Sequence, residues 1–175
     1  MKAIALISYG HFEREFLESI ADTVRHEYGY QVRIEDSHID LTEFYDPTRK
    51  QYDGNRLLKK IDLKYGSKAI KTIGLFRVDL FIPILTYIYG QAFLNGSTGI
   101  ASLFRLNNER YGMPMDDNLL LERFKKEVVH ELGHTFGLKH CHNPSCVMVS
   151  STYVEDIDQK SAELCKNCRQ EIEKK

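Results

Sequence analysis

The sequence predicts one α/β domain with a twisted mixed β-sheet and flanking helices. Residues 3–8 are small and branched apolar side chains, as in a buried strand, and residues 13–27 place apolar side chains on one face of a helix that Gly29 ends. Residues 31–35 favour a second strand. This strand–helix–strand order implies parallel pairing through a right-handed crossover. A length of 175 residues suits one compact domain.

The following residues predict further helices and strands. Residues 40–54 are polar and contain Pro47, so they predict a loop in which Arg49 and Lys50 face solvent. The other predicted elements are a helix over residues 55–65, strands over 69–75 and 100–106, a long helix over 118–138 capped by Asp116 or Asp117, and a C-terminal helix over 156–174 that carries the last two cysteines near its middle.

Composition and charge disfavour two classes of partner. Lys and Arg number 24 and Asp and Glu number 25, a net charge of −1, so there is no basic field for nucleic acid. The longest apolar segment, residues 80–89, falls well short of the ~20 residues that cross a bilayer. Residues 1–8 resemble a signal peptide only superficially, because no small-residue cleavage site follows. We therefore expect a cytoplasmic monomer without nucleic-acid or membrane partners.

The most informative motif runs from His130 to His140. His130 and His134 lie four positions apart, so on an α-helix they share one face and can bind one ion. Gly137 can adopt the left-handed conformation that ends a helix, and the chain can then return His140 to the same ion. Three histidines leave a fourth position open, which is the ligand pattern of a catalytic zinc. Glu131 lies beside the pair and can accept a proton from water at that position.

All four cysteines follow this motif and predict a second metal site. Cys141 and Cys146 form a C-x4-C pair, and Cys165 and Cys168 form a C-x2-C pair, both within the spacing of zinc sites. Four thiolates leave no open position, so this zinc would be structural. Because His140 and Cys141 are neighbours, with Cα atoms about 3.8 Å apart, the second zinc would brace His140. Two disulfides or free thiols are the alternatives, but no secretory signal favours an oxidising compartment.

The combined pattern resembles the signature of the archaemetzincins, which are zinc metallopeptidases of the metzincin clan. The run from His130 to Cys168 carries the resemblance, because it joins the extended zinc motif to four cysteines and to Met148. The resemblance covers essentially the whole chain. Upstream segments that also look like the family are residues 45–52, 78–81, 89–92 and 99–104.

This resemblance implies a metzincin-like fold and a role for each residue of the motif. The sheet and an active-site helix would form an upper subdomain over about residues 1–137, and residues 138–175 would form a lower helical subdomain braced by the structural zinc. Glu131 would be the general base, and Met148 would form an apolar floor beneath the catalytic metal. Two Zn²⁺ ions per chain are expected, the catalytic one held by His130, His134 and His140 and the structural one by Cys141, Cys146, Cys165 and Cys168.

The resemblance also implies an antiparallel edge strand that borders the cleft, where a peptide substrate can bind as an added strand. In metzincins this strand precedes the active-site helix region, so we assign it to the predicted strand that begins at Ile100. The residues expected to bind substrate are Ile100, Ala101, Ser102, Leu103 and Phe104.

We expect a zinc-dependent metallopeptidase that hydrolyses peptide bonds, and the resemblance suggests an aminopeptidase on short peptides. The sequence does not indicate which acid would hold the substrate's free amine. One alternative is a two-zinc module that binds a peptide or protein with little or no turnover, and another is a hydrolase of a different amide. Glu131 disfavours the binding module, because zinc binding alone does not need this carboxylate.

Overall fold

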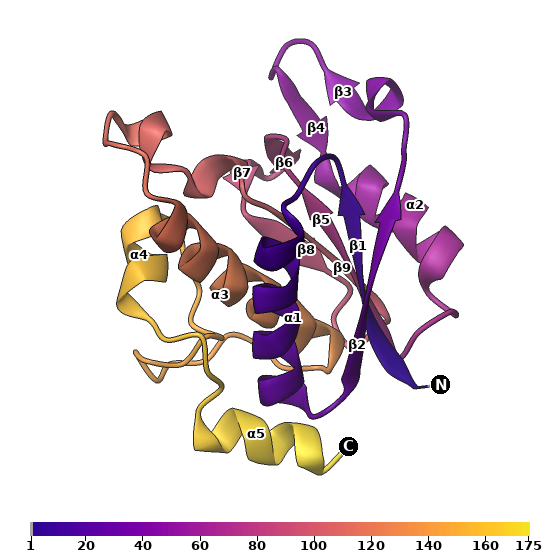
Figure 1. The fold of residues 1–175 in the computed structure, drawn as a ribbon, viewed down its shortest axis with the longest axis vertical. Coiled ribbons are helices and arrows are strands. Elements are labelled where there is room, and N and C mark those ends of the chain that lie inside the picture. The colour runs from indigo at the N-terminus through magenta and orange to yellow at the C-terminus, as the bar shows by residue number, and fades with distance from the viewer. Residues whose placement is uncertain (1) are drawn as a thin grey trace.

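Residues 2–175, which the computed structural model describes, form two β-sheets (Figure 1). The larger sheet contains β1 (Ala3–Tyr9), β2 (Gln31–Ser37), β5 (Lys71–Phe76), β8 (Gly90–Ala92) and β9 (Thr98–Ser102). Their spatial order is β2-β1-β5-β9-β8. The first four strands in this order pair in parallel, and β8 pairs antiparallel with β9 at the sheet edge. The predicted mixed sheet with an antiparallel edge strand is therefore confirmed.

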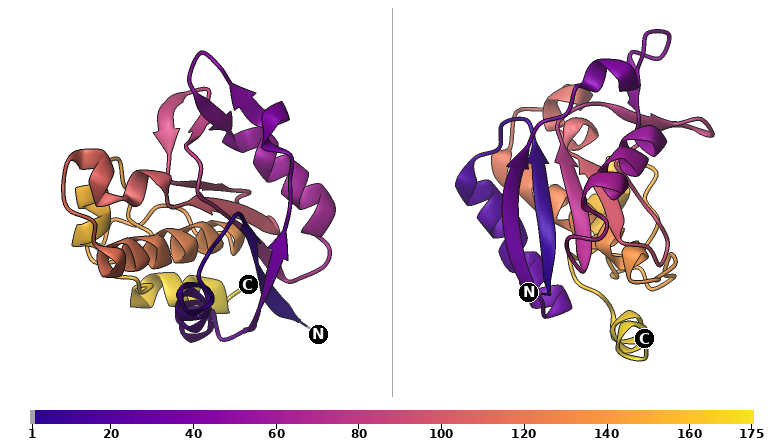
Figure 2. Two further views of the ribbon diagram at one scale, coloured as in Figure 1. Left: turned by 45° about the horizontal axis from the view of Figure 1, so that its top comes forward. Right: turned by 90° about the vertical axis from the view of Figure 1, so that its right-hand side faces the viewer.

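Helices cover both faces of this sheet. Helices α1 (Arg14–Tyr28) and α3 (Asp117–Thr135) lie on one face, and α2 (Gly54–Tyr65) lies on the other (Figure 2). Successive side chains of a strand point to opposite faces. In β1, Ile4 therefore joins the core shared with α1 and α3, whereas Ala5 joins the core shared with α2. The parallel pairing of β1 and β2 across α1 confirms the predicted crossover unit.

A smaller sheet forms partly where a loop was predicted. Its strands are β3 (Tyr45–Asp46), β4 (Gln51–Asp53), β6 (Leu80–Ile82) and β7 (Leu85–Ile88), in the spatial order β3-β4-β6-β7. The prediction of a loop over residues 40–54 is thus wrong in part. Two features favour the hairpin: the rings of Tyr45 and Tyr52 pair across it with centroids 5.1 Å apart, and the Asp46 carboxylate accepts backbone N–H bonds in its turn.

Arg49 and Lys50 in this hairpin are exposed, as predicted. The Arg49 guanidinium nevertheless fixes the hairpin to the neighbouring turn. It donates hydrogen bonds to the backbone oxygens of Pro83 and Leu85 at 3.3 and 3.0 Å, and it lies 4.3 Å from the centre of the Phe81 ring. The smaller sheet is therefore held by side chains as well as by its strand pairing.

The long helix α3 begins at the predicted place and ends early. The Asp116 side chain accepts a hydrogen bond from the Leu119 N–H at 3.0 Å, so Asp116 is the N-cap. The helix ends at Thr135 rather than near residue 138, because Gly137 adopts a left-handed conformation with φ 88°. This turn places the residues after Gly137 beneath the helix, as the motif predicts.

The C-terminal region contains two short helices instead of the single predicted helix. Helices α4 (Val154–Gln159) and α5 (Lys166–Glu173) are separated by a segment that is not helical. Backbone hydrogen bonds of 3.0 Å join that segment to residues 145–147, so the Ser161 N–H and the Glu163 carbonyl are not free to continue a helix. Cys165 therefore immediately precedes α5, and Cys168 lies in the first turn of α5.

Three short 3₁₀ helices complete the regular structure of the described chain. They are η1 (Leu41–Phe44), η2 (Phe104–Leu106) and η3 (Asn108–Tyr111). The strand predicted over residues 100–106 is thus shorter at its end, since β9 gives way to η2. None of the helices formed by residues 2–175 has both the length and the apolar character needed to cross a membrane.

Candidate active site and metal centres

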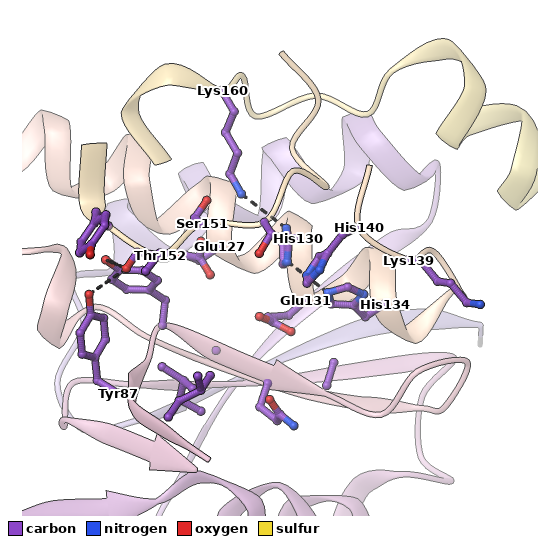
Figure 3. Close-up of a pocket in the computed structure, with 18 of the residues that line it drawn as sticks. Tyr87, Glu127, His130, Glu131, His134, Lys139, His140, Ser151, Thr152 and Lys160 are labelled. Atoms are coloured by element: carbon purple, nitrogen blue, oxygen red, sulfur yellow. Dashed lines mark hydrogen bonds between the residues drawn. The ribbon is translucent and has the colours of Figure 1, made fainter. Parts of the chain in front are cut away.

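Three histidine side chains converge at the end of α3 (Figure 3). His130 and His134 lie one turn apart, and their Nε2 atoms are 3.1 Å apart. With His140, each ring offers a nitrogen within 4.8 Å of the others. A tetrahedral zinc with Zn–N distances of about 2.0–2.1 Å separates its nitrogen ligands by about 3.3–3.4 Å. The spacing of the three rings therefore fits one zinc ion.

Hydrogen bonds orient two of these rings for metal binding. The Nδ1 atoms of His130 and His134 lie 2.8 and 2.7 Å from the backbone oxygens of Val147 and Leu138. A carbonyl accepts a proton only from Nδ1–H, so this contact leaves Nε2 unprotonated and available to a metal. Burial lowers the pKa of His130 well below its usual value, and it also lowers the pKa of His134 and His140. Burial therefore favours the neutral imidazoles that bind metal.

Met148 packs against the turn of α3 that lies between His130 and His134. Its side chain is fully buried, and a Cβ atom at Gly133 would collide with its sulfur. Gly133 therefore permits Met148 to approach the helix closely. The Met148 backbone oxygen accepts a 3.0 Å hydrogen bond from the Cys141 N–H. Met148 therefore contacts both the histidine helix and the first residue of the cysteine cluster.

Glu131 is a buried carboxylate beside the histidines. It lines a cleft together with the three histidines and is only 5% exposed. Its side chain forms no hydrogen bond or ion pair with any of residues 2–175. Burial raises its pKa well above the usual value, and the neighbouring Glu127 adds to the rise while Lys160 opposes it. Gly90 of β8 makes room for it, because a Cβ atom there would lie 2.8 Å from Glu131 Oε1.

The cleft has a volume of about 760 Å³ and lies between the β7–β8 region, α3 and residues 150–153. Toward one end a hydrogen bond joins two sides of the cleft, from the Tyr87 hydroxyl to the Thr152 backbone oxygen at 2.8 Å (Figure 3). The Tyr87 ring is held in turn by the Arg105 guanidinium, 4.4 Å from its centre. Asp79 holds Arg105 through two hydrogen bonds of 2.8 and 2.6 Å, so Asp79 supports the wall of the cleft.

The predicted substrate-binding strand is placed wrongly. The residues from Ile100 to Ser102 lie in β9, which is buried and bonded to β5 on one side and β8 on the other. Leu103 is buried, and Phe104 begins η2. The antiparallel edge strand is β8, which is only three residues long. It was not predicted because it lies in an apolar segment that Pro83 and Gly90 interrupt. Gly90, Gln91 and Ala92 of β8 line the cleft.

The four cysteines gather where the loop after α3 meets the start of α5. All four are free thiols, and their sulfurs lie within 4.8 Å of one another. The Cys141–Cys165 and Cys146–Cys168 sulfurs are 3.9 and 3.8 Å apart. Zn–S distances of about 2.3 Å place tetrahedral sulfur ligands about 3.8 Å apart. The cluster therefore fits a structural zinc and does not form the alternative disulfides.

Backbone N–H groups also point at these sulfurs. The N–H groups of Met148 and Cys165 donate to Cys146 Sγ at 3.5 and 3.4 Å, and the Asn143 N–H donates to Cys141 Sγ at 3.4 Å. Such bonds stabilise the charge of thiolate ligands. These backbone N–H groups therefore support thiolate ligands at Cys141 and Cys146.

Comparison with known proteins decides the family. The model of peptidase family M54 matches residues 1–174. This chain belongs to that family. The archaemetzincin of Thermococcus kodakarensis is 34% identical over 178 residues, covering 98% of this chain and 96% of the relative. The archaemetzincin of Pyrococcus horikoshii is 37% identical over 163 residues, covering 91% of this chain and 86% of the relative.

Solved structures of archaemetzincins have the same fold. The archaemetzincin of Methanopyrus kandleri superposes with a TM-score of 0.86 at 29% identity, covering 99% of this chain and 94% of that one. A zinc-dependent peptidase from Methanocorpusculum labreanum superposes with a TM-score of 0.87 at 28% identity, covering 97% and 100%. The resemblance to archaemetzincins and the metzincin-like fold are confirmed, and the chain is a member of a zinc metallopeptidase family.

Three residues that line the cleft were not predicted from the sequence. Glu127 precedes Glu131 by four positions, so helical spacing alone could have placed it on the same face. Tyr87 had no local signal, because its contact with Thr152 joins two distant segments. Lys160 had none either, since it was assigned to a continuous helix, whereas in the structure it is buried and donates to the Val149 backbone oxygen at 2.9 Å.

Proposed function

We propose that this protein is a zinc-dependent aminopeptidase that acts on short peptides, with Glu131 as its general base. The observation that carries the proposal is the unpartnered carboxylate of Glu131 beside three histidines whose Nε2 atoms fit one zinc. His130, His134 and His140 would hold the catalytic zinc. When bound, zinc supplies a Lewis acid that polarises the scissile carbonyl and makes water a nucleophile near neutral pH.

Glu131 would move the protons of the reaction. Its carboxylate would take a proton from the attacking water and deliver it to the leaving amine. A base serves best when its pKa lies near the working pH. The position of Glu131 supports this role, because its carboxylate lies in the cleft beside the histidines and has no partner among residues 2–175.

The outer edge of β8 would bind the peptide backbone. Within the described chain, β8 pairs with β9 on one side only, so its other edge can pair with an added strand. Gly90 to Ala92 lie along the cleft beside Glu131. This strand replaces the region from Ile100 to Phe104 in the proposal.

The hydrogen bond between Tyr87 and Thr152 supports an action on chain ends. It joins two sides of the cleft on the side of the N-terminal half of α3. While this bond is formed, it would limit how far a substrate extends on this side of the histidines. This geometry suits an exopeptidase better than an enzyme that binds a long internal segment.

The second zinc would be held by Cys141, Cys146, Cys165 and Cys168 and would be structural. Four thiolates would fill a tetrahedron and leave no position for a substrate. We therefore propose two zinc ions per chain, with different tasks.

A peptide mixture tests the proposed activity. The zinc-loaded protein is incubated with peptides of about 3 to 20 residues, each with a free or an acetylated amino terminus, and the products are mapped by mass spectrometry. The proposal predicts removal of single amino-terminal residues from short free peptides, with acetylation blocking the cut. Internal cuts would contradict the aminopeptidase assignment. No cuts at all would favour the binding module or a different amide substrate.

A further inference from the structure

Glu127 is a second buried carboxylate in the cleft, and the reaction described above does not use it. It precedes Glu131 by one helical turn, which is about 6 Å along the axis. Its side chain is 3% exposed and lines the cleft together with Glu131. Figure 3 shows Glu127 and Glu131 projecting from the same side of α3. The cleft therefore continues from the histidines past a second acidic group.

The Glu127 carboxylate has no partner among residues 2–175. No hydrogen bond or ion pair reaches it, and burial raises its pKa. The charge of Lys160 opposes this rise in the Glu127 pKa, yet no ion pair joins the two side chains. The Lys160 amine instead donates to the Val149 backbone oxygen at 2.9 Å and lies 3.5 Å from His130 Nδ1. The nearby ammonium group is thus held by a backbone oxygen instead of by Glu127.

A second polar group in the same part of the cleft also lacks a partner. The Ser151 hydroxyl is buried without a hydrogen bond to the described chain, and Ser151 lines the cleft. A buried polar group without a partner costs free energy, and a buried charge costs more. A ligand with a cation and hydrogen-bond donors would remove both costs. Two unpartnered acceptors that line the same cleft therefore indicate a site for such a ligand.

We propose that Glu127, with the Ser151 hydroxyl, forms a subsite for a cationic group of the peptide substrate. This inference rests on the proposed peptidase function. A scissile carbonyl held beside Glu131 lies about one helical turn from Glu127, within reach of either of two groups of the substrate. One is the free α-amine of the amino-terminal residue, and the other is the side chain of lysine or arginine. An ammonium or guanidinium group would form a charge-assisted hydrogen bond with Glu127.

Three hydroxamic acids separate the two sources of the cation. Norleucine hydroxamate carries only an α-amine, Nα-acetyl-lysine hydroxamate carries only a side-chain amine, and Nα-acetyl-norleucine hydroxamate carries neither. The hydroxamate group binds zinc and anchors each ligand beside the histidines. Binding to the zinc-loaded protein is measured by calorimetry at about pH 6.5, below the usual pKa of an α-amine.

At least one of the two cationic ligands should bind the wild-type protein about tenfold more tightly than the neutral ligand, a difference of about 1.4 kcal/mol. The ligand with the advantage identifies the source of the cation. The advantage should fall below about twofold in Glu127→Gln, which keeps the shape of the side chain and removes its charge. It should persist in Glu122→Gln, because Glu122 is exposed on the same helix and pairs with Lys125.

Equal binding of all three ligands, or an advantage that survives in Glu127→Gln, would overturn the subsite and leave the proposed peptidase function intact. Failure of every ligand to bind the zinc-loaded protein would overturn the catalytic zinc site, and the subsite with it. If Glu127→Gln does not fold, Glu127→Asp provides the test. Aspartate keeps the charge but withdraws it by one methylene group, so the advantage should fall there as well, and an unchanged advantage would contradict the inference.

Discussion

The two candidate metal centres meet at one peptide bond but differ in almost every other respect. The histidine set comes mainly from a single helix, faces a cleft of about 760 Å³ and has an unpartnered carboxylate beside it. The cysteine set comes from two segments far apart in the sequence, and backbone N–H groups bond to two of its sulfurs. Three nitrogens leave a position open for chemistry, whereas four sulfurs close the coordination shell.

This difference shows how a small domain can keep an open metal site rigid. A three-ligand site needs support, since its fourth position belongs to water or substrate. Met148 supplies part of that support, because it lies against Gly133 in the helix and bonds to Cys141 and Cys146 through its backbone. The cysteine cluster would thus act as an anchor for the segment that carries His140.

A chelator should remove zinc from the histidine site before it removes zinc from the cysteine site. The open histidine site has fewer ligands and is exposed to the cleft, so it should lose zinc at a lower chelator concentration than the cysteine site. Activity should disappear first, and the thermal unfolding temperature should fall only at higher chelator concentration. Parallel measurements of activity and unfolding during a chelator titration test this order. Simultaneous loss of both would mean that the two sites do not differ as described.

Glu131→Gln should separate zinc binding from chemistry at the open site. Loss of a general base should lower kcat by about 10²–10⁴-fold, while the zinc content stays that of the wild type because Glu131 is not a ligand. Kinetics and metal analysis of the same preparation check both statements. Glu122→Gln is the matched control and should retain full activity. Activity within about threefold of wild type in Glu131→Gln would rule out this carboxylate as the base.

Gly133→Ala should weaken the contact between the two centres. The new methyl group would displace the Met148 sulfur, and such overpacking costs about 1–3 kcal/mol. In a chain of this size each kcal/mol lowers Tm by about 2–4 °C. Thermal unfolding of the zinc-loaded variant measures the effect. An unchanged Tm would show that Met148 does not support α3 in the way proposed.

Tyr87→Phe should have the smallest effect. It removes the shorter of two hydrogen bonds to the Thr152 backbone oxygen, the other coming from Tyr89 at 3.4 Å, and one such hydrogen bond contributes about 0.5–1.5 kcal/mol. Zinc content should not change, but peptides that extend beyond this hydrogen bond should be cut faster relative to short ones. The ratio of the two cleavage rates is the measurement. A ratio equal to that of the wild type would argue against Tyr87 as a limit on substrate length.

The parts of the molecule that were predicted correctly depend on local spacing. His130 and His134 share a helix face because they are four residues apart, and Gly137 ends the helix because glycine tolerates positive φ. The strand–helix–strand opening likewise follows from periodicity within residues 3–35. Each of these inferences needs only neighbours along the chain.

The parts that were predicted wrongly depend on partners far away in the sequence. The short strand β8 exists because it pairs with β9, and its three residues carry little signal of their own. The predicted C-terminal helix is divided because residues 145–147 bond to the segment between α4 and α5. A three-residue strand and a broken helix are decided by long-range pairing, which a single sequence does not display.

The most direct test of the link between the two centres is the zinc affinity of Cys165→Ser. Cys165 is a ligand of the proposed structural zinc and, among the described residues, forms no hydrogen bond with the three histidines. If the cysteine cluster anchors His140 through Cys141, this variant should lose the structural zinc. The affinity of the histidine site should then fall about 10–100-fold, as for the loss of other groups that support metal ligands. Competition with a chelator measures that affinity, and a histidine site that binds zinc as tightly as in the wild type would contradict the account.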